Sequence, residues 1–278
     1  MKIDKIINNN IVSAYDTDGK EVVIMGRGLG YKAKIGQTIP KERIEKVFKM
    51  DDQNSVDKLK SLFKDLPLEH IQISNDIVMY AMKNLNKKLN KNIYITLTDH
   101  ICFAIDRYKK GFEFTNPLKW EVKRLYKNEY RIGMYAVELI NKRAGVQLLD
   151  DEAASIALHI VNAEYNTSPS EAINITTLLE NVLCIVKNFF DIELDEDSLH
   201  YERFITHMMY LARRIFKKQQ LDDNEAEYMS MIRNLYPEDY KCSYEISDYI
   251  EKEFKRKLTE EELMYLTLHI KRVRTDEN

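Results

Sequence analysis

Part of the chain occurs twice. The tripeptide Leu-His-Ile stands at residues 158–160 and again at 268–270, and each copy follows a run of three acidic residues. The two histidines are 110 residues apart (269 − 159 = 110), and the pair Leu125-Tyr126 returns at the same offset as Leu235-Tyr236. Separate landmarks that share one offset are the signature of an internal repeat. We therefore expect two similar units of roughly a hundred residues each, a normal domain size.

Each repeat carries a second histidine upstream of the first. This histidine stands seven residues before an arginine, as His100 before Arg107 and His207 before Arg214. The offset here is 107 (207 − 100 = 107), and an extra surface loop would account for the three-residue difference. Four of the six histidines thus recur, namely His100, His159, His207 and His269, while His70 and His200 have no counterpart and are expected to be structural or surface residues.

Both repeats are patterned as helices. From residue 58 onward, apolar residues recur at three- and four-residue steps, and the cluster Asn166-Thr167-Ser168-Pro169-Ser170 separates the two repeats. The pattern predicts helices over 97–110, 118–130, 132–144 and 150–165 in the first repeat, and over 172–190, 199–218, 225–236, 244–254 and 259–273 in the second.

The N-terminal segment is different in kind. It holds five of the eight glycines within the first 36 residues, and its β-branched runs at 11–15 and 21–25 flank a hairpin turn. With residues 2–7 and 31–35, the pattern predicts four short antiparallel strands. Residues 40–48 predict a short amphipathic helix or turn, and residues 50–56 a linker. A sheet this small buries little apolar surface, so we expect it to dimerise or to dock on another part.

Charge is unevenly distributed along the chain. The net charge is −3, but residues 1–50 hold ten Lys/Arg against six Asp/Glu, which gives +4 there and −3 − 4 = −7 elsewhere. A basic head on an acidic body indicates a polyanionic partner for the head alone.

Composition excludes several classes of protein. No run of about 18 apolar residues and no N-terminal apolar core of a signal peptide is present, so we expect neither membrane insertion nor export, and a cytoplasmic location. The three cysteines, Cys102, Cys184 and Cys242, match neither a disulfide framework nor a zinc site. The sequence predicts no cofactor, no metal and no catalytic residue.

The glycine-rich head carries a candidate nucleic-acid surface. Gly26-Arg27-Gly28-Leu29-Gly30 lacks the spacing of a nucleotide loop, and no helix opens directly after it. As an exposed turn it would let a nucleic-acid backbone approach, with the Arg27 guanidinium facing phosphate or a base edge. Asn8-Asn9-Asn10 could bond base edges and Tyr31 could stack on a base. The alternative is that the asparagines only form a turn and Tyr31 fills a small core.

The recurring histidines allow three interpretations. A single histidine in a helix is most often structural. Metal binding is disfavoured because no pair has i, i+4 spacing and no other ligands complete a set. Phosphorylation is the third, because a neutral imidazole nitrogen accepts phosphoryl groups and the added charge can remodel a helical interface. Arg107 and Arg214 share a helical face with His100 and His207, where they could meet a phosphoryl group or simply be solvated.

Several motifs resemble one family, the bacterial transcriptional antiterminators of the BglG/SacY type. Residues 1–11, 19–29 and 43–48 resemble its co-antiterminator RNA-binding domain. Residues 97–100 and 158–164 resemble its first phosphotransferase-system regulation domain, and 203–207 with 268–270 resemble the second more loosely.

The resemblance implies a fold, a function and partners. The fold is a small antiparallel β-sheet RNA-binding domain (1–56) followed by two all-α helical-bundle regulation domains (57–168 and 169–278). Such a protein is not an enzyme. It forms a homodimer and stabilises an mRNA hairpin that overlaps a terminator, and HPr and a sugar-specific enzyme II donate phosphoryl groups to it. The implied RNA-contacting residues are Lys5, Asn8, Asn10, Gly26, Arg27, Gly28 and Tyr31, and the implied phosphorylation sites are His100, His159, His207 and His269.

Two other functions compete with this one. A DNA-binding transcriptional activator with the same regulation domains predicts a helix-turn-helix head. A helical metal enzyme predicts that the histidine pairs bind a metal ion. The period-two pattern and glycine turns of the head favour the RNA-binding regulator.

Overall fold

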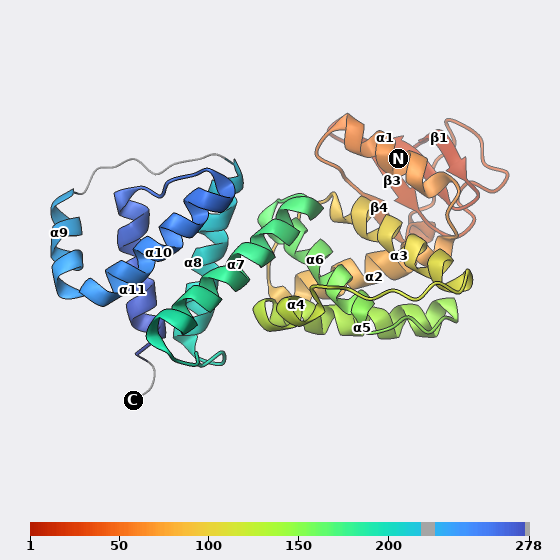
Figure 1. Cartoon of the computed structure of the whole chain (residues 1–278). Helices are drawn as coiled ribbons and strands as arrows, with labels where there is room; N and C mark the ends of the chain where they lie inside the picture. The colour runs from red at the N-terminus through yellow and green to blue at the C-terminus, as the bar shows by residue number, and fades with distance from the viewer. Residues whose placement is uncertain (218–225, 276–278) are drawn as a thin grey trace. The chain divides into compact units, whose positions relative to one another are not determined.

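The chain forms two compact units, residues 1–166 and residues 167–278 (Figure 1). The structure is a computed structural model that describes residues 1–217 and 226–275. The predicted helix end at residue 218 and helix start at residue 225 lie outside the described residues. We describe each unit by itself.

The first unit begins with a four-stranded antiparallel sheet. Its strands β1 (Ile3–Asn8), β2 (Ile11–Tyr15), β3 (Glu21–Met25) and β4 (Lys46–Phe48) lie in the order of the sequence. The prediction of a small antiparallel sheet followed by helices is confirmed, as are the first three strands.

The predicted fourth strand is wrong. Residues 31–35 form turns, and the edge strand is β4, where a helix or turn was predicted; only the 3-10 turn η1 (Lys41–Arg43) is helical there. Gly30 lies so close to β1 that a Cβ would stand 2.0 Å from the backbone oxygen of Asn8. Ile35 is 72% exposed and Tyr31 is 62% exposed, so the large apolar side chains of this segment do not enter the core. The side chain of Phe48 in β4, by contrast, is fully buried.

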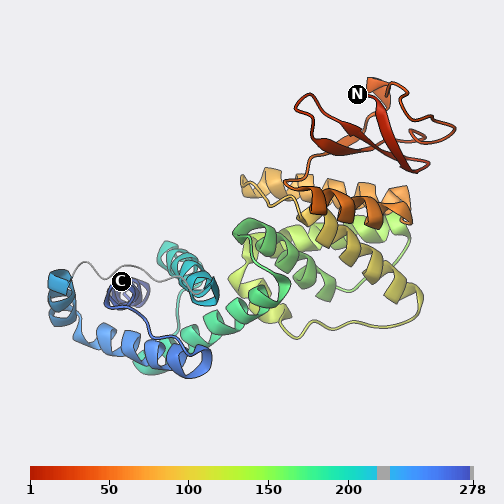
Figure 2. The same ribbon diagram turned by 90° about the horizontal axis from the view of Figure 1, so that it is seen from above.

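The sheet docks on α1 (Gln53–Lys64), as seen from another side in Figure 2. Phe48 of the sheet packs edge-to-face against Phe63 of α1, with ring centroids 5.3 Å apart. Of the predicted linker at residues 50–56, residues 53–56 are instead the first turn of this helix, and the carboxylate of its N-cap Asp52 accepts from the backbone N–H of Ser55 at 2.9 Å. Their polar composition reflects a helix cap, which uses polar side chains as much as a loop does.

The remaining helices of the first unit follow the predicted order. They are α2 (Leu68–Leu85), α3 (Ile93–Lys109), α4 (Lys119–Leu125), α5 (Lys127–Ala144) and α6 (Asp151–Tyr165). The predicted helix 118–130 is divided at Tyr126, whose backbone leaves the helical region (φ −124°, ψ 54°). Gly133 lets α5 approach α6, because a Cβ there would meet the backbone of Ala153 at 2.2 Å.

The second unit consists of α7 (Pro169–Phe190), α8 (Leu199–Lys217), α9 (Ala226–Leu235), α10 (Pro237–Phe254) and α11 (Glu260–Val273). Residues 170–190 of α7 reach the length and hydropathy of a membrane-spanning segment by composition. In the structure, α7 packs on α8 and α10 through fully buried residues such as Leu178, Val182 and Val186, as a core helix does.

Candidate functional site

The histidines of each repeat face one another across two helices. His100 of α3 lies against His159 of α6, with ring centroids 4.8 Å apart. In the second unit His207 of α8 lies against His269 of α11, with centroids 3.9 Å apart. The structure thus brings together each pair that the repeat grouped, whereas His70 contacts Cys102 and belongs to neither pair.

Their environment keeps these imidazoles neutral. Burial lowers the pKa of His100 to about 4, assisted by the Arg107 charge, and burial next to His100 lowers the pKa of His159 to about 3. Burial and the neighbouring His207 lower the pKa of His269 to about 4. The pKa of His207 is also lowered, by burial and then by the Arg272 and Arg214 charges. A neutral ring keeps one lone pair, which a phosphoryl acceptor requires.

Glu152 contacts both a histidine of the first pair and Arg107. One oxygen of this carboxylate accepts from the Arg107 guanidinium, and the other lies 3.1 Å from Nε2 of His100. The Glu152 side chain is 3% exposed. Arg107 is therefore paired rather than solvated.

Glu262 occupies the matching place in the second unit (262 − 152 = 110). Its carboxylate accepts from Nε of Arg214 at 3.3 Å and from Nη2 of Arg256 at 2.9 Å and 3.2 Å. Sequence reasoning noted both acidic runs only as helix starts and missed these two carboxylates. The shared 110-residue offset was the signal that could have identified them.

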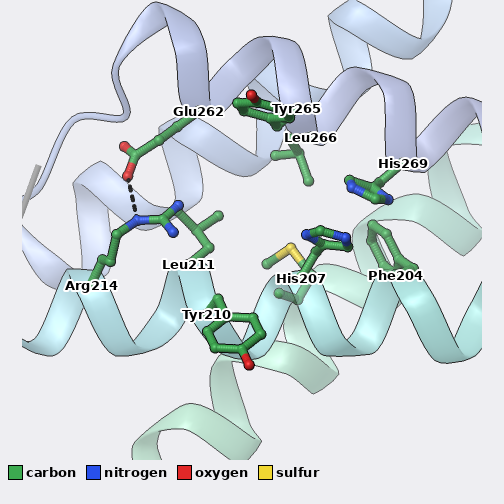
Figure 3. Close-up of a pocket in the computed structure, with 10 residues that line it drawn as sticks. Phe204, His207, Tyr210, Leu211, Arg214, Glu262, Tyr265, Leu266 and His269 are labelled. Atoms are coloured by element: carbon green, nitrogen blue, oxygen red, sulfur yellow. Dashed lines mark hydrogen bonds and ion pairs between the residues drawn. The ribbon is translucent and has the colours of Figure 1, made fainter. Parts of the chain in front are cut away.

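A cavity of about 330 Å³ opens between α8 and α11 (Figure 3). His207 and His269 lie at one end of it, and the Arg214–Glu262 ion pair lies at the other. His207 is exposed, while His269 is only 9% exposed. The same cavity therefore holds an exposed imidazole and a guanidinium.

In the sheet, six of the seven predicted RNA-contacting residues lie at two connected turns, residues 8–10 and 26–31, whereas Lys5 lies within β1. The side-chain oxygen of Asn10 accepts from the backbone N–H of Gly28 at 2.9 Å, and the backbone N–H of Gly26 donates to the Asn10 carbonyl at 3.0 Å. Gly28 has a positive φ of 69° with open space around it, and a Cβ on Gly26 would stand 1.9 Å from the Arg43 carbonyl oxygen. These glycines shape the turn.

The side chains of the predicted RNA-contacting residues differ in availability. Lys5, Arg27 and Tyr31 are exposed, and the Lys32 ammonium lies 5.4 Å from the Tyr31 ring centroid. Asn8 is engaged within the protein, since its amide donates to the Phe63 carbonyl at 2.8 Å and accepts from the backbone of Asn10 at 2.8 Å. Tyr31 is 62% exposed, so the alternative that it fills a small core is wrong.

The described residues lack the two features that the competing functions predict. Residues 1–52, all of which are described, contain no α-helix and therefore no helix-turn-helix. Within residues 1–217 and 226–275, no group of three or more His, Cys, Asp or Glu side chains could hold a metal ion.

Family models match most of the chain, and full-length relatives match nearly all of it. The CAT RNA binding domain matches residues 1–57, and the PRD domain matches residues 75–163 and 180–273. The transcription antiterminator LicT of Bacillus subtilis is 46% identical over 98% of this chain and 99% of its own length. The beta-glucoside operon antiterminator of Dickeya chrysanthemi is 38% identical over 99% of this chain and 98% of its own length.

A solved structure supports the assignment. The crystal structure of GlcT CAT-PRDI is similar with a TM-score of 0.53 and 35% identity, over 59% of this chain and 97% of that one. Its CAT and PRDI parts carry the names of the domains that match this chain at residues 1–57 and 75–163. The chain belongs to the BglG/SacY family of transcriptional antiterminators, RNA-binding regulators with one CAT domain and two PRD domains under phosphotransferase-system control.

Proposed function

We propose that the chain binds a hairpin in nascent mRNA that overlaps a terminator, and so lets transcription continue through it. The proposed division is an RNA-binding domain over 1–56 and regulation domains over 57–168 and 169–278. The observation that carries this proposal is the joined pair of turns, which presents Arg27 and Tyr31 to solvent at one edge of a basic sheet.

Each residue of the edge has its own part in RNA binding. Arg27 and Lys5 meet phosphates or base edges, and Tyr31 stacks on an unpaired base. Asn10 holds the Gly28 amide in place, so it acts on the shape of the turn as well as on RNA. Gly26 permits the close approach of its backbone to the Arg43 carbonyl, and Gly28 permits the positive φ of the turn. Asn8 contacts RNA once its side-chain amide releases the Phe63 carbonyl and donates to the RNA instead.

The histidines are the proposed control points. HPr and a sugar-specific enzyme II donate phosphoryl groups to His100, His159, His207 and His269, and the added charge shifts the balance between active and inactive arrangements of a homodimer. A shift of a few kcal/mol is enough for a switch. The chain acts in the cytoplasm, as a regulator of carbohydrate use rather than as an enzyme.

The direct test is binding of the full-length chain to hairpin RNA. Arg27→Ala and Tyr31→Ala should each weaken binding by roughly tenfold or more, since a base contact or stacked base contributes about 1–3 kcal/mol. Lys20→Ala, an exposed lysine at the opposite hairpin turn, is the matched control and should change affinity little. Equal losses of affinity in all three variants would show that the head binds RNA only through nonspecific charge, and would contradict the proposal.

A further inference from the structure

The two repeats hold their histidines in different ways, although they share the same four residues. In each unit a histidine pair and an arginine–glutamate pair connect the same two helices, α3 with α6 and α8 with α11. Only in the first does the carboxylate also contact a histidine, through the 3.1 Å approach of Glu152 to Nε2 of His100.

Two further partners of Glu262 account for the difference: the backbone N–H of Thr259, which donates to its carboxylate at 3.1 Å, and the Arg256 guanidinium. Arg256 follows the left-handed residue that ends α10, and it takes both oxygens of Glu262. The matching residue of the first repeat (256 − 110 = 146) is Val146, which follows the left-handed Gly145 at the end of α5 in the same way and is buried. Valine offers no hydrogen bond, so Glu152 keeps an oxygen for His100.

That contact fixes the proton on the imidazole ring. A carboxylate paired with a guanidinium is ionised and can only accept, so Nε2 of His100 must donate the hydrogen. The hydrogen bond made by one ring nitrogen decides which nitrogen keeps the lone pair. In neutral His100 the lone pair therefore resides on Nδ1.

We propose that Glu152 is a positioning residue that makes Nδ1 of His100 the phosphoryl-accepting nitrogen. In the second unit His207 lacks this control, because Glu262 is held by Arg214, Arg256 and the Thr259 N–H. The inference rests on the proposed function only for the source of the phosphoryl group. In the transfer, the Nδ1 lone pair forms the N–P bond while the bond from phosphorus to the donor breaks and its electron pair leaves with the donor. The proton stays on Nε2, and the Glu152 carboxylate balances the positive charge that the ring acquires.

The first measurement is the tautomer of His100 in the unmodified full-length chain, from the ¹⁵N chemical shifts of its ring. The expected result is a hydrogen on Nε2 and a lone pair on Nδ1. A hydrogen on Nδ1 would overturn the inference. This measurement needs no variant and no phosphoryl donor, so it stands apart from the proposed function.

Glu152→Gln gives the second test. The amide oxygen is needed by Arg107, so the amide NH₂ faces His100 and donates to Nε2, which reverses the tautomer. Replacing a carboxylate by an amide beside a catalytic histidine has this effect and costs up to about 10⁴ in rate. Glu129→Gln, which removes another buried carboxyl of the same unit, is the matched control and should leave the His100 tautomer unchanged. An unchanged tautomer in Glu152→Gln would contradict the inference.

Phosphoramidate then reports the acceptor nitrogen without any protein donor. Its P–N bond breaks, ammonia leaves, and the phosphoryl group joins the ring. We expect phosphate on Nδ1 of His100, a loss of at least tenfold in Glu152→Gln, and unchanged labelling of His207 as the internal reference. Phosphate on Nε2 of His100 would overturn the inference. Normal labelling by phosphoramidate with none from HPr or enzyme II would instead reject the proposed control while the inference holds.

Discussion

The partner of a buried carboxyl distinguishes the first repeat from the second. Glu129 of α5 is hydrogen-bonded to Glu164 of α6, and burial together with the Glu164 charge raises the pKa of Glu129 to about 7. The equivalent residues of the second repeat, at the 110-residue offset, are Asp239 and Arg274, which form an ion pair at 2.5 Å and 3.1 Å. At this position the first unit thus joins two acidic side chains, whereas the second unit joins an acidic and a basic side chain.

This difference predicts that the first unit loses stability as the pH rises. Because the folded pKa of Glu129 lies above its unfolded value of 4.5, the folded state binds more protons between pH 4.5 and about 7, and the free energy of unfolding falls over that window. Glu129→Gln mimics the protonated acid and should remove this dependence, gaining on the order of 2 kcal/mol above pH 8. Urea unfolding of both proteins at pH 5 and pH 8 checks it. A constant difference between them at the two pH values would contradict the prediction.

Gly30 should tolerate no side chain. A Cβ at this position would stand 2.0 Å from the backbone oxygen of Asn8, whereas a Cβ on Gly19 would meet nothing within 4 Å. We expect Gly30→Ala to cost on the order of 2 kcal/mol or more, since backbone must move. Gly19→Ala carries only the penalty of its positive φ, about 1 kcal/mol. Thermal unfolding compares the two variants, and equal losses would show that the close approach at Gly30 is relieved cheaply.

At the scale of elements, α1 is where the sheet meets the helical part of its unit. Phe48 packs edge-to-face against both Phe63 of α1 and Tyr94 of α3, and Lys60 of α1 pairs with Glu21 of β3 at 2.8 Å. Asp52 caps this helix through Ser55. Asp52→Ala should therefore destabilise the first unit by about 1 kcal/mol. Asp52→Ser retains a capping oxygen and should recover most of that loss in chemical unfolding, and failure to recover it would assign the effect to something other than the cap.

Sequence patterns predicted the helices from α2 onward far better than they predicted α1 and β4. Long amphipathic segments such as α6 carry their own signal, because burial of one face sets the period. β4 has only three residues, and its pairing with β3 depends on a chain reversal by the turns between residues 26 and 45, which no local pattern encodes. The histidine pairs followed from the repeat itself. Glu152 and Glu262 did not, because an acidic residue at a helix start has a sufficient local explanation in the helix dipole.

At the scale of the whole molecule, the charge division predicts how RNA binding responds to salt. The head carries +4 and the rest −7, so binding is driven by the head and opposed by the body. Each phosphate that the protein neutralises steepens the fall of log affinity with log salt by about 0.7 for single-stranded and 0.9 for duplex nucleic acid. If Arg27 neutralises one phosphate, Arg27→Ala should reduce the steepness of this slope by about 0.7–0.9. RNA-binding titrations from roughly 50 to 300 mM salt measure the slope. An unchanged slope would indicate that Arg27 contacts a base and no phosphate.

The division into compact units predicts which fragment keeps a working head. Residues 1–166 retain all of the core beneath the sheet, whereas a fragment of residues 1–56 lacks Leu59, Phe63 and Ile71, which cover the face made by Ile11 and Phe48. We expect fragment 1–166 to unfold in one cooperative transition that does not depend on concentration. Fragment 1–56 exposes that apolar face, so it should unfold at a lower temperature or gain stability with increasing concentration as two copies cover each other. Calorimetry at several concentrations distinguishes these results. If fragment 1–56 matched fragment 1–166 in midpoint at every concentration, the packing against α1 would contribute nothing to the stability of the sheet.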